Sequence, residues 1–271
     1  MKINDEKELR RISEFAFEKQ KTAESRCFFY RENFDEYYDL IKRVAPFSEF
    51  YLAEKEGKLS TVIILEKDDI SMFHGIFTDD PDEAEQMIND VKRELETDKI
   101  DINISLENTV IEKMLLPLGF RQVSSEWNMK VLKEDFRRIF SSDLTALRIT
   151  DNNIDSYAQY IEEAFKDCYW NLERLRGNLE EQNITVFLRH EDVAAVSRVE
   201  GGEDPWIMGV VSFSKDQSGT EAEVTQYHAE ELLQESGYVS LFTEDIKTVP
   251  LLMKMGFTLV SSCRTLSTYM E

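Results

Sequence analysis

The sequence predicts an α/β fold that is used twice, each copy being a mixed, mostly antiparallel sheet flanked by helices. Two repeat signals support the duplication. The pattern GFxxVSS occurs at residues 119–125 and again at residues 256–262, which are 137 residues apart in a chain of 271. Residues 33–41 and 153–161, at an offset of 120, share Asn, Asp, Tyr and Ile at four matching positions. A chain of this length is long for one hydrophobic core, so two domains of ordinary size are expected.

The order of apolar patterns is the third observation. Each copy shows a short strand, a helix, three strands separated by charged turns, a second helix, a buried strand, a short helix and a final strand. Consecutive strands indicate an antiparallel meander, and the later helices indicate a mixed sheet. The three-strand groups are expected at 49–57, 60–69 and 71–78 in the first copy, and at 184–192, 193–202 and 205–214 in the second.

The domain boundaries follow from these repeats. Residues 5–21 have apolar side chains at near-helical spacing and no later counterpart, so residues 1–24 are predicted to be a helical extension. The first domain is expected at 25–131, a linker at 132–143 and the second domain at 144–271. Because the repeat offset grows from 120 to 137, the second copy carries about 17 extra residues, which we place at 167–183.

Composition excludes some classes of function. The formal net charge is −22, and an acidic surface repels nucleic-acid phosphates and anionic lipids. Such a surface would favour a cationic substrate, although solubility alone also explains it. No apolar run is long enough to span a membrane and the first residues are charged, so we expect a cytoplasmic protein. The sequence does not specify the oligomeric state.

The remaining motif searches are negative. The three cysteines, Cys27, Cys168 and Cys263, are odd in number and far apart, which argues against a disulfide framework. The three histidines are equally scattered, so no metal site is expected. The sequence also lacks a Walker loop, a GxGxxG fingerprint and a G-x-S-x-G nucleophile motif.

The segment after the strand at 207–214 carries the functional signal. Its sequence, KDQSGTEAEVTQYHAEELLQESGY, resembles the pyrophosphate loop and following helix of the GNAT superfamily of acyl-CoA-dependent N-acetyltransferases. The resemblance covers both copies from about residue 25 and looks like a tandem arrangement. In that family, backbone N–H groups at the start of the helix hold the CoA pyrophosphate. The matching positions here are Gln217, Ser218, Gly219, Thr220, Glu221 and Ala222.

Two of these positions depart from the family pattern. Thr220 replaces a glycine, and Glu221 places a negative charge beside the expected pyrophosphate, so binding there requires Glu221 to point to solvent. The corresponding residues of the first copy, 78–83, include four carboxylates, which suit a helix start in water but not one that holds phosphates. The first copy is therefore expected to be degenerate, and the second to bind acetyl-CoA as a co-substrate.

The resemblance also implies catalytic roles. The family's general acid, a tyrosine four residues before the glycine of GF, is replaced by Leu115 and Leu252. Substitute proton donors in the second copy are Tyr227, His228 and Tyr269. An amine acceptor must lose a proton before it attacks the thioester, and the candidate bases are Glu244 and Asp245. The backbone expected to pair with the pantetheine arm and polarise the thioester is that of Val210, Val211 and Ser212.

Two hypotheses follow. The first is an acyl-CoA-dependent N-acetyltransferase that transfers the acyl group directly to an amine, on a small molecule or a peptide. The second is a catalytically inactive binding or interaction protein that has kept the fold. Thr220, Glu221 and the two leucines favour the second hypothesis, whereas the preserved spacing from Gln217 to Gly237 favours the first.

Overall fold

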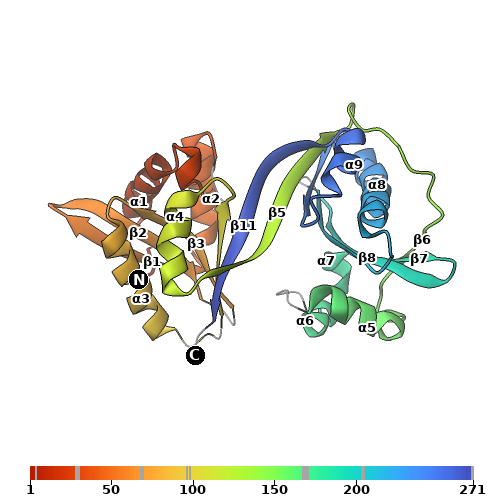
Figure 1. The fold of residues 1–271 in the computed structure, drawn as a ribbon, viewed down its shortest axis with the longest axis horizontal. Coiled ribbons are helices and arrows are strands. Elements are labelled where there is room, and N and C mark those ends of the chain that lie inside the picture. Colours follow the sequence, from red (N-terminus) through yellow and green to blue (C-terminus); the bar gives the residue numbers. More distant parts are fainter. Residues whose placement is uncertain are drawn as a thin grey trace. The chain divides into compact units, whose positions relative to one another are not determined.

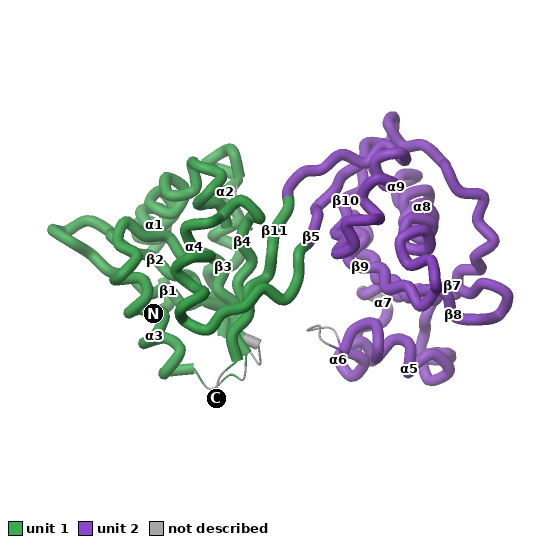
Figure 2. Tube along the Cα trace, in the orientation of Figure 1, with its two compact units in different colours: residues 1–125, 262–271 green, residues 126–261 purple. Residues whose placement is uncertain are grey.

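The chain forms two compact units, which Figure 2 distinguishes by colour. Unit 1 comprises residues 1–125 together with 262–271, and unit 2 comprises residues 126–261. This computed structural model describes all residues except 4, 28–30, 68–69, 96, 98, 167–170, 203–204 and 270–271. No helix in the described part is long and apolar enough to cross a membrane.

Unit 1 begins with the predicted N-terminal helix (Figure 1). Its helices are α1 (Glu6–Lys19), α2 (Phe34–Val44), α3 (Pro81–Glu94) and α4 (Thr109–Leu115), with 3₁₀ turns η1 (Ala23–Ser25) and η2 (Leu116–Leu118). Its strands are β1 (Ser48–Lys55), β2 (Lys58–Glu66), β3 (Ile70–Thr78), β4 (Lys99–Ser105) and the first part of β5 (Arg121–Leu132). The strand that the sequence predicts before α2 falls largely on residues outside the described part.

Unit 2 repeats this order. Its helices are α5 (Ile154–Phe165), α6 (Leu172–Arg176), α7 (Leu179–Gln182), α8 (Gln217–Glu235) and α9 (Val249–Lys254). Its strands are β6 (Thr145–Arg148), β7 (Ile184–Arg189), β8 (Asp192–Glu200), β9 (Trp206–Ser212), β10 (Tyr238–Thr243) and part of β11 (Thr258–Tyr269). The short helices α6 and α7 lie within the predicted insertion at 167–183.

Each unit contains the predicted three-stranded antiparallel meander within a mixed sheet, and one parallel pair follows it. β1, β2 and β3 pair antiparallel, and β3 pairs parallel to β4. In unit 2, β6 to β9 pair antiparallel and β9 pairs parallel to β10. Side chains alternate between faces: Ile63 packs with α3 and α4, whereas Val62 packs with α1 and α2. Helices therefore cover both faces of the sheet.

The final strands are exchanged between the two sequence repeats. The second part of β5 pairs with β10 in unit 2, from Trp127↔Thr243 to Leu132↔Tyr238. The second part of β11 pairs with β4 in unit 1, from Cys263↔Ser105 to Tyr269↔Lys99. Both strands change colour along their length in Figure 2. The compact units thus differ from the predicted domains at 25–131 and 144–271, because the strands of each repeat pair with the last strand of the other repeat.

The repeated GFxxVSS motif has a structural explanation at both sites. Gly119 and Gly256 have φ angles of 90° and 97°, which glycine adopts readily at the end of a helix. The next residues, Phe120 and Phe257, are buried, and their N–H groups donate to the carbonyls of Leu115 and Leu252. The VSS residues lie near the start of each exchanged strand, two residues after it begins, and each strand passes from one unit to the other at its serines.

Candidate functional site

The candidate site of unit 2 begins where β9 and β10 separate. These parallel strands pair only at Trp206↔Ser240 and Ile207↔Leu241. β9 nevertheless continues to Ser212 with its other edge paired to β8, while β10 ends at Thr243. From Met208 onward, the edge of β9 that faces β10 has no strand partner among the described residues. The predicted backbone of Val210, Val211 and Ser212 lies on this stretch, and all three residues are half-buried.

The six residues predicted to form a pyrophosphate loop are helical. α8 begins at Gln217, so residues 217–222 form its first turn and the start of its second. The reason is an N-cap that the motif comparison overlooked: the Asp216 side chain accepts a hydrogen bond from the Gly219 N–H at 3.1 Å. The Asp216 carbonyl accepts from the Thr220 N–H. A carboxylate of the chain itself therefore occupies the position at the helix N-terminus where an anion would bind.

Glu221 does not point to solvent, contrary to the requirement stated for the loop. It is only 9% exposed. Its two carboxyl oxygens accept hydrogen bonds from the hydroxyls of Thr243 at 2.5 Å and Thr248 at 2.9 Å. Burial raises the pKa of Glu221 to about 7, with the nearby charges of Asp245 and Glu244 adding to the effect and the two threonine hydrogen bonds opposing it. Glu221 thus joins α8 to the end of β10 and the start of α9.

The two predicted bases lie directly after Thr243, beside the same helix start. Asp245 accepts a hydrogen bond from the Ser218 hydroxyl at 2.5 Å. Burial opposes ionisation of Asp245, but this hydrogen bond and the N–H of Lys247 outweigh it and lower the pKa of the carboxyl. Glu244 is exposed. The structure therefore brings together Glu221, Ser218 and Asp245 beside the end of β10, where this strand no longer pairs with β9.

The predicted substitute proton donors are not placed together. Tyr227 packs edge-on against Phe187 of β7 and donates to Glu231 at 2.9 Å, and burial raises its pKa to about 12. His228 is buried against β8 with its Nε2 2.7 Å from the Ser197 hydroxyl, and burial lowers its pKa. Tyr269 belongs to unit 1, because it lies at the end of the exchanged strand β11.

Leu115 and Leu252, at the positions of the family's tyrosine, are fully buried core residues. Leu115 packs in the hydrophobic core that α3 and α4 cover in unit 1, and Leu252 packs in the core that α8 and α9 cover in unit 2. Neither side chain can donate a proton.

The corresponding gap in unit 1 contains a segment of the chain itself. β3 and β4 pair only from Ile70↔Lys99 to Phe73↔Ile102, although both strands continue. Beyond that point Cys27 forms an isolated bridge with Ile104, and the Arg26 carbonyl accepts from the Ser105 N–H. The other edge of β4 is already paired with β11, so Arg26 and Cys27 must lie on the edge that faces β3.

The start of α3 resembles that of α8 in its capping. Asp80 caps the helix by accepting from the Glu83 N–H, and Lys55 forms an ion pair with the same carboxylate. The contact with Lys55, followed by the hydrogen bond from Glu83, lowers the pKa of Asp80. Both units therefore place an aspartate at the helix N-terminus that follows the diverging strand.

The fold can now be compared with known proteins. A structure of a GCN5-related N-acetyltransferase from Sphaerobacter thermophilus aligns over 98% of this chain and 93% of its own, with a TM-score of 0.63 and 12% identity. The chain has the GNAT fold. A putative acetyltransferase from Pyrococcus horikoshii aligns over 98% of this chain and 87% of its own (TM-score 0.54, 9% identity). A GCN5-related N-acetyltransferase from Kribbella flavida aligns over 84% and 92% (TM-score 0.52, 15% identity). No family model and no curated protein matches the sequence.

Sequence reasoning missed two parts of this site. The capping role of Asp216 could have been predicted from sequence, since an aspartate just before the first residues of a helix is a common N-cap. The pairing of Glu221 with Thr243 and Thr248 could not, because these residues are more than twenty positions apart. Within the described residues, no group of three or more His, Cys, Asp or Glu side chains is arranged to hold a metal ion.

Proposed function

We propose that unit 2 is an acyl-CoA-dependent N-acyltransferase that transfers an acetyl or related group directly to an amine. The observation that carries this proposal is the separation of β9 from β10 after Ile207 and Leu241. It leaves a stretch of β9 backbone free to hydrogen-bond with an extended ligand, and a pantetheine arm carries amide groups suited to that pairing. The same N–H groups can polarise a thioester carbonyl.

Glu221 is the best-placed residue for handling the amine proton. It is buried beside the end of β10, and its pKa of about 7 matches the requirement for a general base that works near neutral pH. Asp245, whose pKa is lowered, is better suited to attracting a protonated amine than to removing its proton. Glu244, the other predicted base, is exposed and can serve the same attraction. The acceptor is therefore expected to be cationic before it reacts.

Leu252 fills the position of the family's general-acid tyrosine in the core, so no tyrosine at that position can protonate the leaving thiolate. Tyr227 and His228 lie against β7 and β8 and are engaged there. We therefore expect slow turnover.

Unit 1 is proposed to bind no CoA. The Arg26–Cys27 segment pairs with the edge of β4 that faces β3, so it lies where a pantetheine arm paired with β3 would have to run. Cys27 is buried between the strands, and burial raises the pKa of its thiol to about 12. The first repeat contributes structure instead, since the second part of β5 pairs with β10 in unit 2.

The decisive experiment uses Asp216→Asn, with Asp80→Asn as the matched control. Asparagine caps a helix as well as aspartate does, so the change removes a charge and keeps the cap. If CoA phosphates approach the start of α8, removing this charge should tighten acetyl-CoA binding by about 1 kcal/mol, or roughly fivefold, in calorimetric titrations. The Asp80→Asn variant should bind as the wild type does.

A second function has specific support. The Asp216 cap and the buried Leu252 both favour a non-catalytic GNAT-fold protein that binds other partners. If neither the wild type nor Asp216→Asn binds acetyl-CoA or CoA at millimolar concentration, the acyltransferase assignment fails and this alternative stands.

A further inference from the structure

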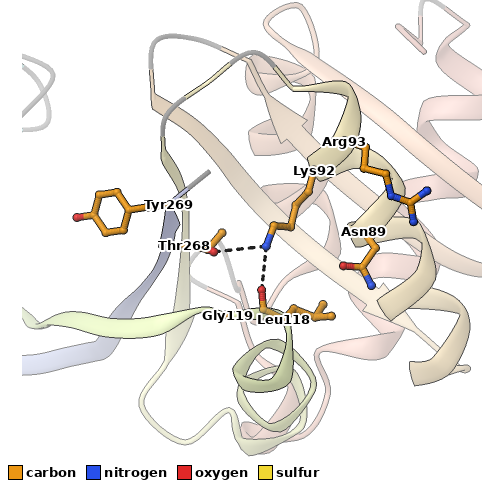
Figure 3. A pocket seen from close by; sticks show the side chains of 7 residues that line it. All are labelled: Asn89, Lys92, Arg93, Leu118, Gly119, Thr268 and Tyr269. Atoms are coloured by element: carbon orange, nitrogen blue, oxygen red, sulfur yellow. Dashed lines mark hydrogen bonds between the residues drawn. The ribbon is translucent and has the colours of Figure 1, made fainter. Parts of the chain in front are cut away.

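A hollow in unit 1 lies between the C-terminal half of α3, η2 and the end of β11 (Figure 3). Its volume is about 620 Å³, which is within the usual range for small-molecule sites. The lining residues are Asn89, Lys92, Arg93, Leu118, Gly119, Thr268 and Tyr269. None of these carries a carboxylate, although acidic residues outnumber basic ones by 54 to 32 in the chain.

Lys92 is the central group of this hollow. Its ammonium donates to the Leu118 carbonyl at 2.8 Å and to the Thr268 hydroxyl at 3.4 Å, as the dashed lines in Figure 3 show. Its Nζ also lies 5.6 Å from the centre of the buried Phe120 ring. Burial lowers the pKa of Lys92. Both hydrogen-bond partners are neutral, so the positive charge is not compensated by a carboxylate within the described part of the chain.

An uncompensated, half-buried cation is unusual, because buried charges are normally paired. Lys55, Lys67 and Lys99, by contrast, each contact a carboxylate. An ammonium has three N–H donors, and Lys92 uses two of them. The third has no partner in the part of the chain that the structure describes, and the Thr268 hydroxyl, which accepts from Lys92, still has its own proton to donate.

The neighbouring side chains add further donors. The Asn89 amide lies one turn before Lys92 on α3, and Figure 3 shows both side chains beside Leu118. Arg93 forms an ion pair with Asp90 at 3.3 Å, but its side chain is 75% exposed, and exposed ion pairs contribute little energy. Its guanidinium can therefore turn toward a bound anion at small cost.

We propose that this hollow binds a small phosphate-bearing anion, with Lys92 as the central charge and Asn89, Thr268 and Arg93 as further donors. A lysine ammonium binds phosphate as a point charge, whereas planar, bidentate recognition of a carboxylate is typical of arginine. The site is in unit 1 and does not depend on the acyltransferase assignment of unit 2.

Binding should also hold the exchanged strand in place. Thr268 comes from β11, whereas Lys92 and Asn89 come from α3 of the first repeat. A ligand that contacts these three residues would connect β11 to α3. A ligand that binds only the folded state stabilises that state by mass action. Phosphate should therefore raise the melting temperature of the protein as well as bind to it.

The test is a titration of the full chain with inorganic phosphate at pH 7.5, read by the ³¹P line width and by thermal denaturation, with ionic strength held constant by chloride. Saturable broadening and a rise in melting temperature are expected for the wild type. Lys92→Met keeps the aliphatic stem and should weaken binding at least tenfold. Lys113→Met, which removes an exposed charge from α4 of the same unit, should change the affinity less than twofold.

Two results would overturn the assignment. One is the absence of saturable binding to the wild type up to about 20 mM phosphate, a concentration at which even weak sites fill. The other is equal binding by Lys92→Met. If that variant does not fold, Asn89→Ala and Thr268→Val replace it, and each should weaken binding several-fold. Acetate titrated in the same way should bind more weakly than phosphate, and equal binding would contradict the choice of phosphate.

Discussion

Replacing Glu221 with glutamine should make the stability of the protein less dependent on pH. The carboxyl has a pKa of about 7 in the folded protein, against 4.5 for an ordinary glutamate. Between these values the folded state holds a proton that the unfolded state has released. Stability from this group is therefore complete below pH 4.5 and is lost as the pH rises to 7, by roughly 3 kcal/mol in total.

Glu221→Gln keeps the shape of the side chain and cannot ionise. Its amide oxygen can accept from one threonine and its amide nitrogen can donate to the other, so the contacts with Thr243 and Thr248 can persist. The variant should gain stability relative to the wild type as the pH rises. From pH 5.5 to 8.5 the difference in free energy of unfolding should increase by about 2 kcal/mol.

Urea denaturation at the two pH values measures this difference. The control is Glu235→Gln, which changes an exposed carboxylate at the end of the same helix and should give the same difference at both pH values. A Glu221→Gln difference that does not change with pH would refute the conclusion that Glu221 is buried and difficult to ionise.

Three further predictions test the fold. Gly256→Ala should destabilise unit 2 by more than about 2 kcal/mol, because a Cβ there would lie 2.1 Å from the Asp135 carbonyl oxygen. Gly119→Ala, whose Cβ would lie 3.4 Å from the nearest atom, should destabilise the protein only by the about 1–2 kcal/mol that a positive φ costs. Thermal denaturation of the two variants compares these effects. Leu252→Tyr should lower the melting temperature without raising any transferase activity, since the side chain is fully buried and the extra volume would overpack the core. A fragment of residues 1–143 should not give a folded monomer by NMR, because β4 lacks its partner β11 and the second part of β5 lacks its partner β10. A dispersed spectrum of the monomeric fragment would contradict the exchange of strands.

Most of the element order could be predicted from sequence because it depends on local patterns. The meanders, the helices that follow them and the buried strands each have a period or a cap within a few residues. The exchange of β5 and β11 could not be predicted this way. Both strands carry the same VSS residues near their start, and the alternation of their side chains would be identical whether each strand paired within its own repeat or with the other one.

The helix that follows the diverging strands could be predicted from sequence, but the contacts of its first residues could not. The resemblance predicted a loop at residues 217–222, whereas α8 already begins at Gln217. It also required Glu221 to point to solvent, as charged residues usually do. Its burial depends on Thr243 and Thr248, which β10 and α9 bring to it only in the folded unit.

The exchanged strands also determine the order in which the protein can fold during synthesis. The edge of β4 stays unpaired until residues 262–269 have been made, more than 150 residues after β4 itself. At typical translation rates of about 5–20 residues per second, this delay lasts roughly ten to thirty seconds. An unpaired edge invites pairing with another chain, so the nascent first repeat is vulnerable to aggregation during that interval. We expect the soluble yield of this protein to be limited more by the supply of chaperones than by the stability of the folded state.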